Sequence, residues 1–140
     1  MSVIITKKNK LVETLNSLID WDDKYLQLID LGKRLPTFDN KQKTEGNRVQ
    51  GCTARTWLTG EPDRQGRLIF EGESDSQLVK GLLAILIEIY SQALPKEILA
   101  DNCDLTQELQ LNGNIMPVRL MGFEAMQKKI RQIAKSKVDS

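Results

Sequence analysis

The sequence predicts an α+β protein of one compact domain, in which a small antiparallel β-sheet packs against helices. Segments with apolar residues at helical spacing lie on both sides of a middle region that is rich in β-forming and turn-forming residues. A chain of 140 residues buries roughly 68% of its unfolded surface, which is enough for one core. No internal repeat or low-complexity tract divides the chain. We therefore expect a single domain over residues 1–140.

Two helices are expected before the sheet. Asn9 can cap a first helix over residues 11–19, and Asp20 can cap a second helix that runs to Leu31. Gly32 is the expected end of the second helix, because glycine readily adopts the left-handed conformation found there. The spacing of the large residues of this helix predicts that four of them share one face: Trp21, Tyr25, Leu28 and Ile29.

The middle of the chain is expected to form a β-hairpin. Residues 53–58 and 67–72 have the composition of strands, and residues 60–66 between them have turn chemistry. Because a two-stranded hairpin alone is only marginally stable, it needs helices or a further strand, and residues 48–49 can extend it. The polar residues 36–47 are expected to form an exposed loop that leads into this region.

Three helices are expected after the hairpin. Ser74 and Gln77 have the spacing of a capping box, so a central core helix is expected to follow them. Pro95 can begin a short helix that ends near Leu99, and the last helix is expected to begin near Pro117. The apolar residues of the last helix recur at helical intervals: Leu120, Phe123, Met126, Ile130 and Ile133.

The charge balance argues against whole-surface attraction to nucleic acid or to an acidic membrane. Twenty Lys and Arg against nineteen Asp and Glu leave a net charge of +1. The longest apolar stretch, residues 81–87, is far shorter than the ~20 residues that span a bilayer. The N-terminus lacks the basic-then-apolar order of a secretory signal. We expect a cytoplasmic protein that binds neither nucleic acid nor membrane.

The most informative single residue is Cys52, because the chain contains no histidine. Without imidazole, a thiol nucleophile must be activated by its electrostatic surroundings or by a partner. Cys52 and Cys103 together cannot supply a four-ligand zinc site, so we expect no metal and two reduced thiols rather than a disulfide. At this level the cysteine is compatible with a redox switch, a cysteine hydrolase or a carrier.

Three blocks of sequence carry a resemblance to a known family. They are Asn47-Arg48-Val49-Gln50-Gly51-Cys52 followed by Trp57, then Gly72-Glu73-Ser74-Asp75 with Val79-Lys80-Gly81-Leu82, and Pro117-Val118-Arg119 with Gly122-Phe123-Glu124-Ala125-Met126. In this order and spacing they resemble the SufE family of sulfur-acceptor proteins over most of the chain. The resemblance implies a SufE/NifU-like α+β domain.

The same resemblance implies that Cys52 is the acceptor of persulfide sulfur from a cysteine desulfurase of the SufS/CsdA-like type. The pyridoxal phosphate chemistry then belongs to that partner, and this chain binds no cofactor of its own. The chain would stimulate the desulfurase by removing its sulfur and would pass the sulfur to an iron–sulfur scaffold or another acceptor. It would act as an accessory sulfur-transfer protein rather than as a stand-alone enzyme.

Several residues are expected to support Cys52. Arg119 falls on the family's C-terminal motif, and it is either a cation near the sulfur, a clamp on loop carbonyls or an ordinary exposed arginine. Gly51 is either a hinge or the residue that a positive φ requires. Asp75 either anchors the site or favours the first turn of a helix. The residues expected to face the partner are Arg48, Gln50, Thr53 and Arg55.

Some positions depart from the family pattern. Ala54 stands where the family usually has serine, and Thr56 stands where it usually has an aliphatic residue. Together with Val118 and Leu120 beside Arg119, these changes predict a drier pocket with fewer hydrogen bonds around the cysteine. Trp57 is expected to be half-buried core, and Cys103 is expected to be a bystander.

Two alternative functions stay open from the sequence. One is an adaptor that activates a desulfurase without the thiol, and the other is a redox sensor that uses both cysteines.

Overall fold

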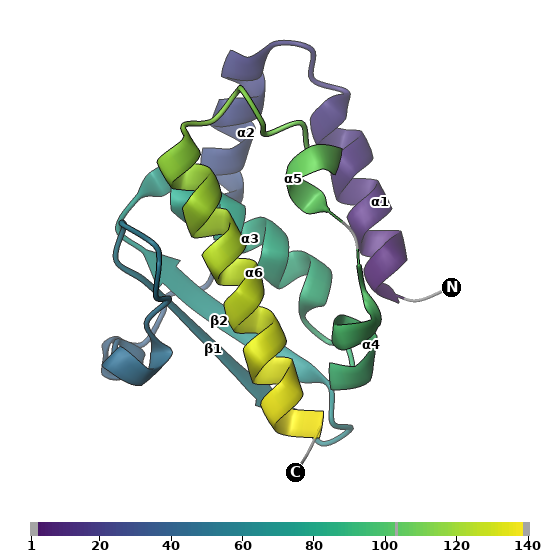
Figure 1. Cartoon of the computed structure of the whole chain (residues 1–140), viewed down its shortest axis with the longest axis vertical. Helices are drawn as coiled ribbons and strands as arrows, with labels where there is room; N and C mark the ends of the chain where they lie inside the picture. Colours follow the sequence, from purple (N-terminus) through teal and green to yellow (C-terminus); the bar gives the residue numbers. More distant parts are fainter. Residues whose placement is uncertain (1–2, 103, 139–140) are drawn as a thin grey trace.

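A buried helix, α3 (Gln77–Tyr90), is the centre of the fold, because eleven of its fourteen residues are buried. The computed structural model describes residues 3–102 and 104–138. The first, second and last α-helices and the second strand of the hairpin contact α3, which lies in the middle of the molecule (Figure 1). The N-cap of α3 is Ser76, whose side chain accepts a hydrogen bond from the Val79 amide at 3.3 Å. The expected cap at Ser74 is therefore wrong by two residues, because Ser74 is the last residue of a strand.

The sheet is the expected antiparallel hairpin. Strand β1 (Thr56–Pro62) pairs with β2 (Leu68–Ser74), with Thr56 opposite Ser74 at one end of the pair. One face is buried beneath α3 and α6 through Leu58, Leu68 and Phe70. The extension by residues 48–49 is confirmed, since Arg48 forms a bridge with Trp57 and the Val49 amide donates to the Thr56 carbonyl at 2.8 Å.

The first helix is longer than expected. Helix α1 covers Val3–Asn16, so Asn9 lies inside it and the expected cap at Asn9 is wrong. The helix begins earlier than expected because its buried face already starts at Ile4. The buried residues recur at helical spacing: Ile4, Lys8, Leu11 and Leu15. Lys8 can be buried there because its ammonium lies 2.6 Å from the Asp101 carboxylate, which also accepts from the Tyr90 hydroxyl at 2.6 Å.

The second helix, α2 (Trp21–Lys33), begins as expected. The Asp20 side chain caps it by accepting a hydrogen bond from the Asp22 amide at 2.9 Å. The expected shared face is only partly buried, because Tyr25 is 42% exposed. The residues of α2 that are fully buried are Lys24, Leu28 and Gly32.

Gly32 lies inside α2 rather than at its end, so the expected stop is wrong. It meets Gly81 of α3, where a Cβ on Gly32 would stand 2.8 Å from the Gly81 amide nitrogen. A Cβ on Gly81 would in turn overlap the Leu28 carbonyl oxygen. The two helices therefore cross with their backbones in contact, and both positions need glycine for this reason.

The C-terminal helices close the fold. They are α4 (Pro95–Ala100), α5 (Leu105–Glu108) and α6 (Pro117–Val138), of which α5 was not expected from the sequence. Figure 1 shows α6 crossing in front of the hairpin, with α4 near its C-terminal end. The stripe expected on α6 is largely confirmed, since Phe123, Met126 and Ile130 are buried. The loop before β1 contains two 3₁₀ helices, η1 (Asn40–Gln42) and η2 (Glu45–Asn47).

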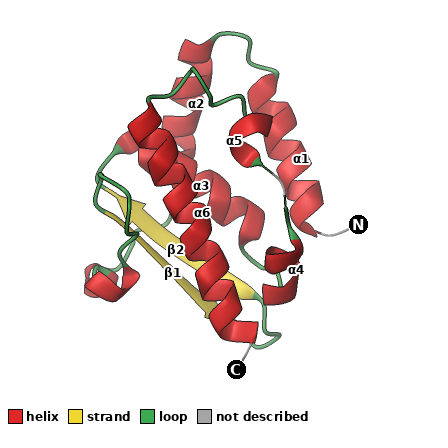
Figure 2. Ribbon diagram, viewed as in Figure 1, coloured by secondary structure: helices red, strands yellow, loops and turns green. Residues whose placement is uncertain are grey.

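These elements confirm the expected α+β fold with one small antiparallel sheet, as the colouring of Figure 2 shows. In the views of Figures 1 and 2, the turn between the strands lies at the opposite end of the molecule from the α1–α2 connection. The other end of the hairpin, where β1 begins and β2 ends, meets the start of α3. Within the described residues, no helix combines the length and apolarity that crossing a bilayer requires.

The contact between α2 and α3 gives a prediction about stability. We expect Gly81→Ala to lower the free energy of unfolding by about 3 kcal/mol, because a rigid carbonyl, rather than a movable side chain, occupies the space of the new methyl group. Gly46→Ala is the matched control, since its Cβ would meet only the Thr44 hydroxyl at 3.9 Å. We expect that control to stay within ~0.5 kcal/mol of the parent in urea unfolding. Equal effects of the two substitutions would contradict this account of the crossing.

Candidate functional site

Cys52 lies in the turn of residues 50–55, here called the cysteine turn, directly before β1. The turn is made possible by Gly51, whose φ of 87° lies in the left-handed region that side chains disfavour. This observation supports the interpretation of Gly51 as a turn residue. Cys52 itself is half-buried, whereas Gly51 and Thr53 on either side of it are exposed. The thiol is therefore held at the surface but turned partly inward.

The inward side of the turn rests on the N-terminal half of α6. A Cβ built on Gly122 would stand 3.0 Å from Cys52 Sγ, so the missing side chain of Gly122 leaves the space that the sulfur fills. One turn further along α6, Ala125 is in van der Waals range of Gly51, at 3.5 Å from a Cβ built there. Small residues on one face of α6 thus leave room for the cysteine turn to lie against the helix.

The sulfur has one polar neighbour among its described contacts. Cys52 Sγ lies 3.5 Å from the Thr56 hydroxyl, which is a hydrogen-bond distance for sulfur. Thr56 is fully buried, and its hydroxyl also lies 3.0 Å from Ser74 Oγ and 3.2 Å from the Ala54 carbonyl oxygen. The expectation of fewer hydrogen bonds around the cysteine is therefore wrong at this position, because Thr56 contributes a hydroxyl that an aliphatic residue lacks.

The last residue of β2 and the two residues that connect it to α3, residues 74–76, contact β1, the cysteine turn and α6. Ser74 bonds the Thr56 hydroxyl at the start of β1. Asp75 accepts from the Arg55 amide at 3.1 Å and from Arg55 Nε at 3.2 Å. The backbones of Asp75 and Arg55 are also joined, since the Asp75 amide donates to the Arg55 carbonyl at 3.0 Å. This connection fixes the end of the cysteine turn to the core helix.

Asp75 therefore anchors the cysteine turn. It precedes the N-cap Ser76, so the interpretation of Asp75 as a residue of the first helical turn is wrong. The Arg55 guanidinium is largely exposed, which makes the backbone hydrogen bond the more valuable part of this contact.

Arg119 joins the same connection from α6. One of its guanidinium nitrogens donates to Ser76 Oγ at 3.1 Å. Among the described residues, the Arg119 side chain makes this hydrogen bond only. No hydrogen bond joins the guanidinium to a carbonyl of the described cysteine turn. Arg119 is thus a clamp, but on the cap of α3 rather than on the loop. The clamp holds the first turns of α6, where Gly122 lies, against the start of α3.

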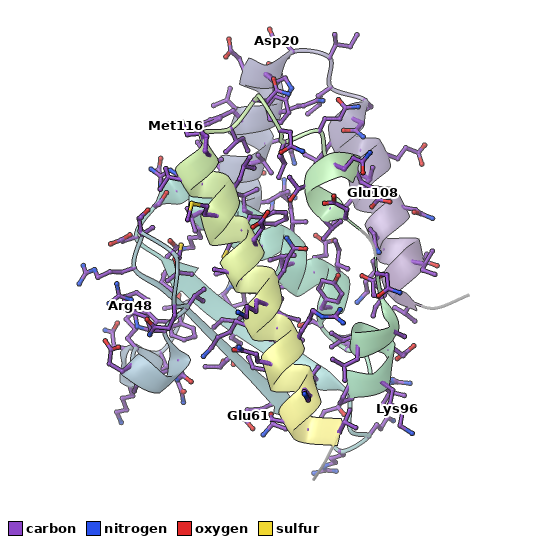
Figure 3. All side chains as sticks on the ribbon, in the orientation of Figure 1. Asp20, Arg48, Glu61, Lys96, Glu108 and Met116 are labelled. Carbon is purple, nitrogen blue, oxygen red and sulfur yellow. The ribbon has the colours of Figure 1, made fainter. Side chains whose placement is uncertain are left out.

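The residues expected to face a partner fall into two groups. Gln50, Thr53 and Arg55 are exposed around the turn. Arg48 is half-buried, pairs with Trp57 through the backbone and lies 3.9 Å from the Glu45 carboxylate. Figure 3 shows Arg48 beside the two 3₁₀ helices and Met116 at the N-terminal end of α6.

Trp57 is half-buried, which confirms its expected place on the strand. The ammonium of Lys43 lies 5.4 Å from the centre of its ring, on the face of the hairpin away from α3. Trp57 is therefore covered by the loop before β1 and contributes to holding that loop on the sheet.

Sequence reasoning missed the parts played by Gly122, Thr56, Ser74 and Ser76. A glycine inside an otherwise apolar helical pattern was a usable signal for Gly122, because such a glycine costs helix stability and often marks a close approach. The serines and the threonine gave no comparable signal, since their partners lie on other elements.

The described residues contain no group of three or more Cys, Asp or Glu side chains placed to hold a metal ion. Cys103 lies outside the described residues, and so does its expected role as a bystander. Cys52 is a free thiol.

The fold and the site define a small α+β protein that presents one half-sheltered thiol from a fixed turn. A family model described as SufE, Fe–S metabolism associated domain, matches residues 9–134. The chain belongs to the SufE family, as its motifs indicated, and it has a role in iron–sulfur metabolism. The fold is also similar to the solution structure of a hypothetical protein from Thermus thermophilus. That similarity has a TM-score of 0.80 at 18% identity and covers 96% of this chain and 97% of that one.

The Asp75 contact gives a prediction about the cysteine turn. We expect Asp75→Ala to lower the free energy of unfolding by about 1 kcal/mol and to speed hydrogen exchange at the Arg55 amide, because that amide loses its carboxylate acceptor. Arg55→Met removes only the exposed ion pair, so we expect it to cost less than about 0.5 kcal/mol. Urea unfolding and amide exchange by NMR measure both effects. If the two variants behave alike, the ion pair rather than the backbone bond fixes the turn.

Proposed function

We propose that this protein is a sulfur acceptor and carrier that takes persulfide sulfur from a cysteine desulfurase onto Cys52. It stimulates the desulfurase by clearing the donor cysteine, and it passes the sulfur on for iron–sulfur cluster assembly. It acts in the cytoplasm, where thiols stay reduced. The pyridoxal phosphate that cleaves the carbon–sulfur bond belongs to the desulfurase, so this chain needs to supply only a nucleophile.

The observation that supports this proposal best is the placement of the Cys52 thiol. It stands on a surface turn that a second protein can reach, yet its sulfur rests against Gly122 and Thr56. A carrier has two opposing needs, because its persulfide must be exposed during exchange and sheltered from oxidants during transit. A half-buried sulfur near the middle of a turn can meet both needs through a small local movement of Cys52, while the ends of the turn stay in place.

The transfer step follows the rules of thiol–disulfide exchange. The Cys52 thiolate attacks the outer sulfur of the donor persulfide, and a new bond forms between Cys52 Sγ and that sulfur. The bond between the two donor sulfurs breaks, and its electron pair leaves with the donor thiolate, which takes up a proton equivalent to the one that the Cys52 thiol released on ionisation. The products are a Cys52 persulfide and a free donor thiol, with no net oxidation.

The geometry of the turn bears on which donor sulfur is attacked. Attack on the inner sulfur would produce a mixed disulfide between the two proteins instead of a transferred sulfur atom. The turn is held at the Arg55 end by Asp75, and just before Gln50 by the Val49 amide, which donates to the Thr56 carbonyl at 2.8 Å. A turn fixed at both ends offers Cys52 from one direction, which favours the outer and more accessible sulfur.

The charges near the turn suit a thiolate-forming encounter. Arg48 and Arg55 lie on either side of Cys52 in the sequence; they pair with Glu45 and Asp75, and the Arg55 side chain is largely exposed. A free thiol is only a few per cent ionised near neutral pH, so cations close to it in the complex raise the reactive fraction. We assign Gln50, Thr53 and Arg55 to the surface that the desulfurase contacts.

The role of the thiol gives a direct prediction. We expect Cys52→Ala to reduce the turnover of a cysteine desulfurase, assayed with cysteine and without added reductant, to the rate of the desulfurase alone. The control is Cys103→Ala, which we expect to stimulate as the parent does. An adaptor that acts by binding alone would keep its stimulation in Cys52→Ala, and that result would contradict the carrier.

A further inference from the structure

The Thr56 hydroxyl has more polar neighbours than it has protons. It is fully buried and lies 3.5 Å from Cys52 Sγ, 3.0 Å from Ser74 Oγ and 3.2 Å from the Ala54 carbonyl oxygen. A hydroxyl group has one proton to donate and can accept from other donors. The direction in which Thr56 donates therefore depends on what its neighbours can donate in return.

The Ala54 carbonyl can only accept, whereas Cys52 and Ser74 can change roles. A neutral Cys52 thiol can donate to Thr56 Oγ1, and the Thr56 proton is then free for Ser74 or Ala54. A Cys52 thiolate has no proton and can only accept. In that state Thr56 must donate to the sulfur for the hydrogen bond to persist, and the Ser74 hydroxyl can donate to Thr56 in turn.

We propose that Thr56 is the hydrogen-bond donor that stabilises the Cys52 thiolate, with Ser74 turning its hydroxyl toward Thr56 when the sulfur loses its proton. This inference rests on the proposed sulfur transfer, for which it names a residue that touches the reacting sulfur atom. The line of donors is Ser74 Oγ to Thr56 Oγ1 to Cys52 Sγ, and it reverses direction when the thiol is neutral.

At the Ser74 end of this line, the surrounding hydrogen bonds and charges favour the state in which Cys52 is a thiolate. Ser74 Oγ accepts a hydrogen bond from the Ser76 amide at 3.3 Å, so the Ser74 proton is free to point at Thr56. Ser76 is the N-cap of α3, a helix of fourteen residues, whose N-terminus carries a partial positive charge. Arg119 adds a full positive charge at the same cap through its bond to Ser76 Oγ. Both charges favour the arrangement in which negative charge develops at the other end of the line.

A hydrogen bond to the thiolate helps the transfer at neutral pH despite a partial cost. It stabilises the reactive thiolate, and it also lowers the intrinsic nucleophilicity of that thiolate. The second effect is smaller, because nucleophilicity changes with roughly half the sensitivity of the ionised fraction. As Sγ attacks, its negative charge moves to the donor thiolate. The Thr56 hydroxyl can then rotate and donate to the Ala54 carbonyl oxygen or to Ser74 Oγ again, with its proton still on Thr56.

The test measures the alkylation of Cys52 by iodoacetamide, because the thiolate is the reacting form. The full-length parent and its variants are treated at neutral pH and at an alkaline pH where thiols are ionised, and each cysteine is followed by peptide mass. We expect Thr56→Val to slow alkylation of Cys52 at least threefold at neutral pH, and to equal or exceed the parent's rate at alkaline pH, where only the intrinsic nucleophilicity of the thiolate differs. Alkylation of Cys103 in the same sample serves as an internal reference.

Two substitutions serve as matched controls. Thr56→Ser keeps the hydroxyl, so we expect a rate near that of the parent. Thr59→Val makes the same chemical change on the opposite face of β1 and is expected to leave Cys52 unaffected. A parent-like rate for Thr56→Val at neutral pH would overturn the inference, and so would a loss of equal size at both pH values, since that loss would report access rather than ionisation.

A second variant keeps the test valid if Thr56→Val does not fold. Ser74→Ala removes the donor that Thr56 needs in the charged state, so we expect a smaller slowing of Cys52 that is again confined to neutral pH. An unchanged rate in Ser74→Ala would count against the proposed line of donors. None of these measurements uses a desulfurase, so failure of the inference leaves the sulfur-transfer proposal standing, and failure of transfer to Cys52 leaves the alkylation result intact.

Discussion

The short connection between β2 and α3 holds the site to the core of the molecule. Its two residues and Ser74, with which β2 ends, each bond a different element: Ser74 bonds Thr56 of β1, Asp75 bonds Arg55 of the cysteine turn, and Ser76 bonds Arg119 of α6. The connection itself cannot move freely, because it joins a paired strand to the most buried helix of the fold. Positions in the turn are therefore determined by the packing of α3, although the turn has no regular structure of its own.

Packing of α6 on the hairpin completes the site from the other side. Phe123, Met126 and Ile130 bury one face of the helix, and this burial sets its rotation about its own axis. At that rotation Gly122 faces Cys52 Sγ and Ala125 faces Gly51. Any larger residue at position 122 would need the space that the sulfur occupies. The apolar stripe of α6 thus serves both core stability and the position of the reactive atom.

The order of elements was predictable from local patterns, and the exact ends and contacts were not. The Asp20 cap and the hairpin follow from short-range chemistry, and both are confirmed. Asn9 has the chemistry of a cap, but the buried face beginning at Ile4 overrides it. Gly32 has the chemistry of a helix end, but its function is the crossing with Gly81. Cys52 was found by elimination and motif, whereas its neighbours Thr56 and Gly122 come from separate elements that only the fold brings together.

The central claim is that Cys52 receives a sulfur atom, and labelling tests it most directly. The protein is incubated with a cysteine desulfurase and ³⁴S-cysteine, and its peptides are then mapped by mass spectrometry without reduction. The account predicts a gain of one ³⁴S atom on the peptide that contains Cys52. A label on the Cys103 peptide, or no label on the chain while the desulfurase is stimulated, would contradict it.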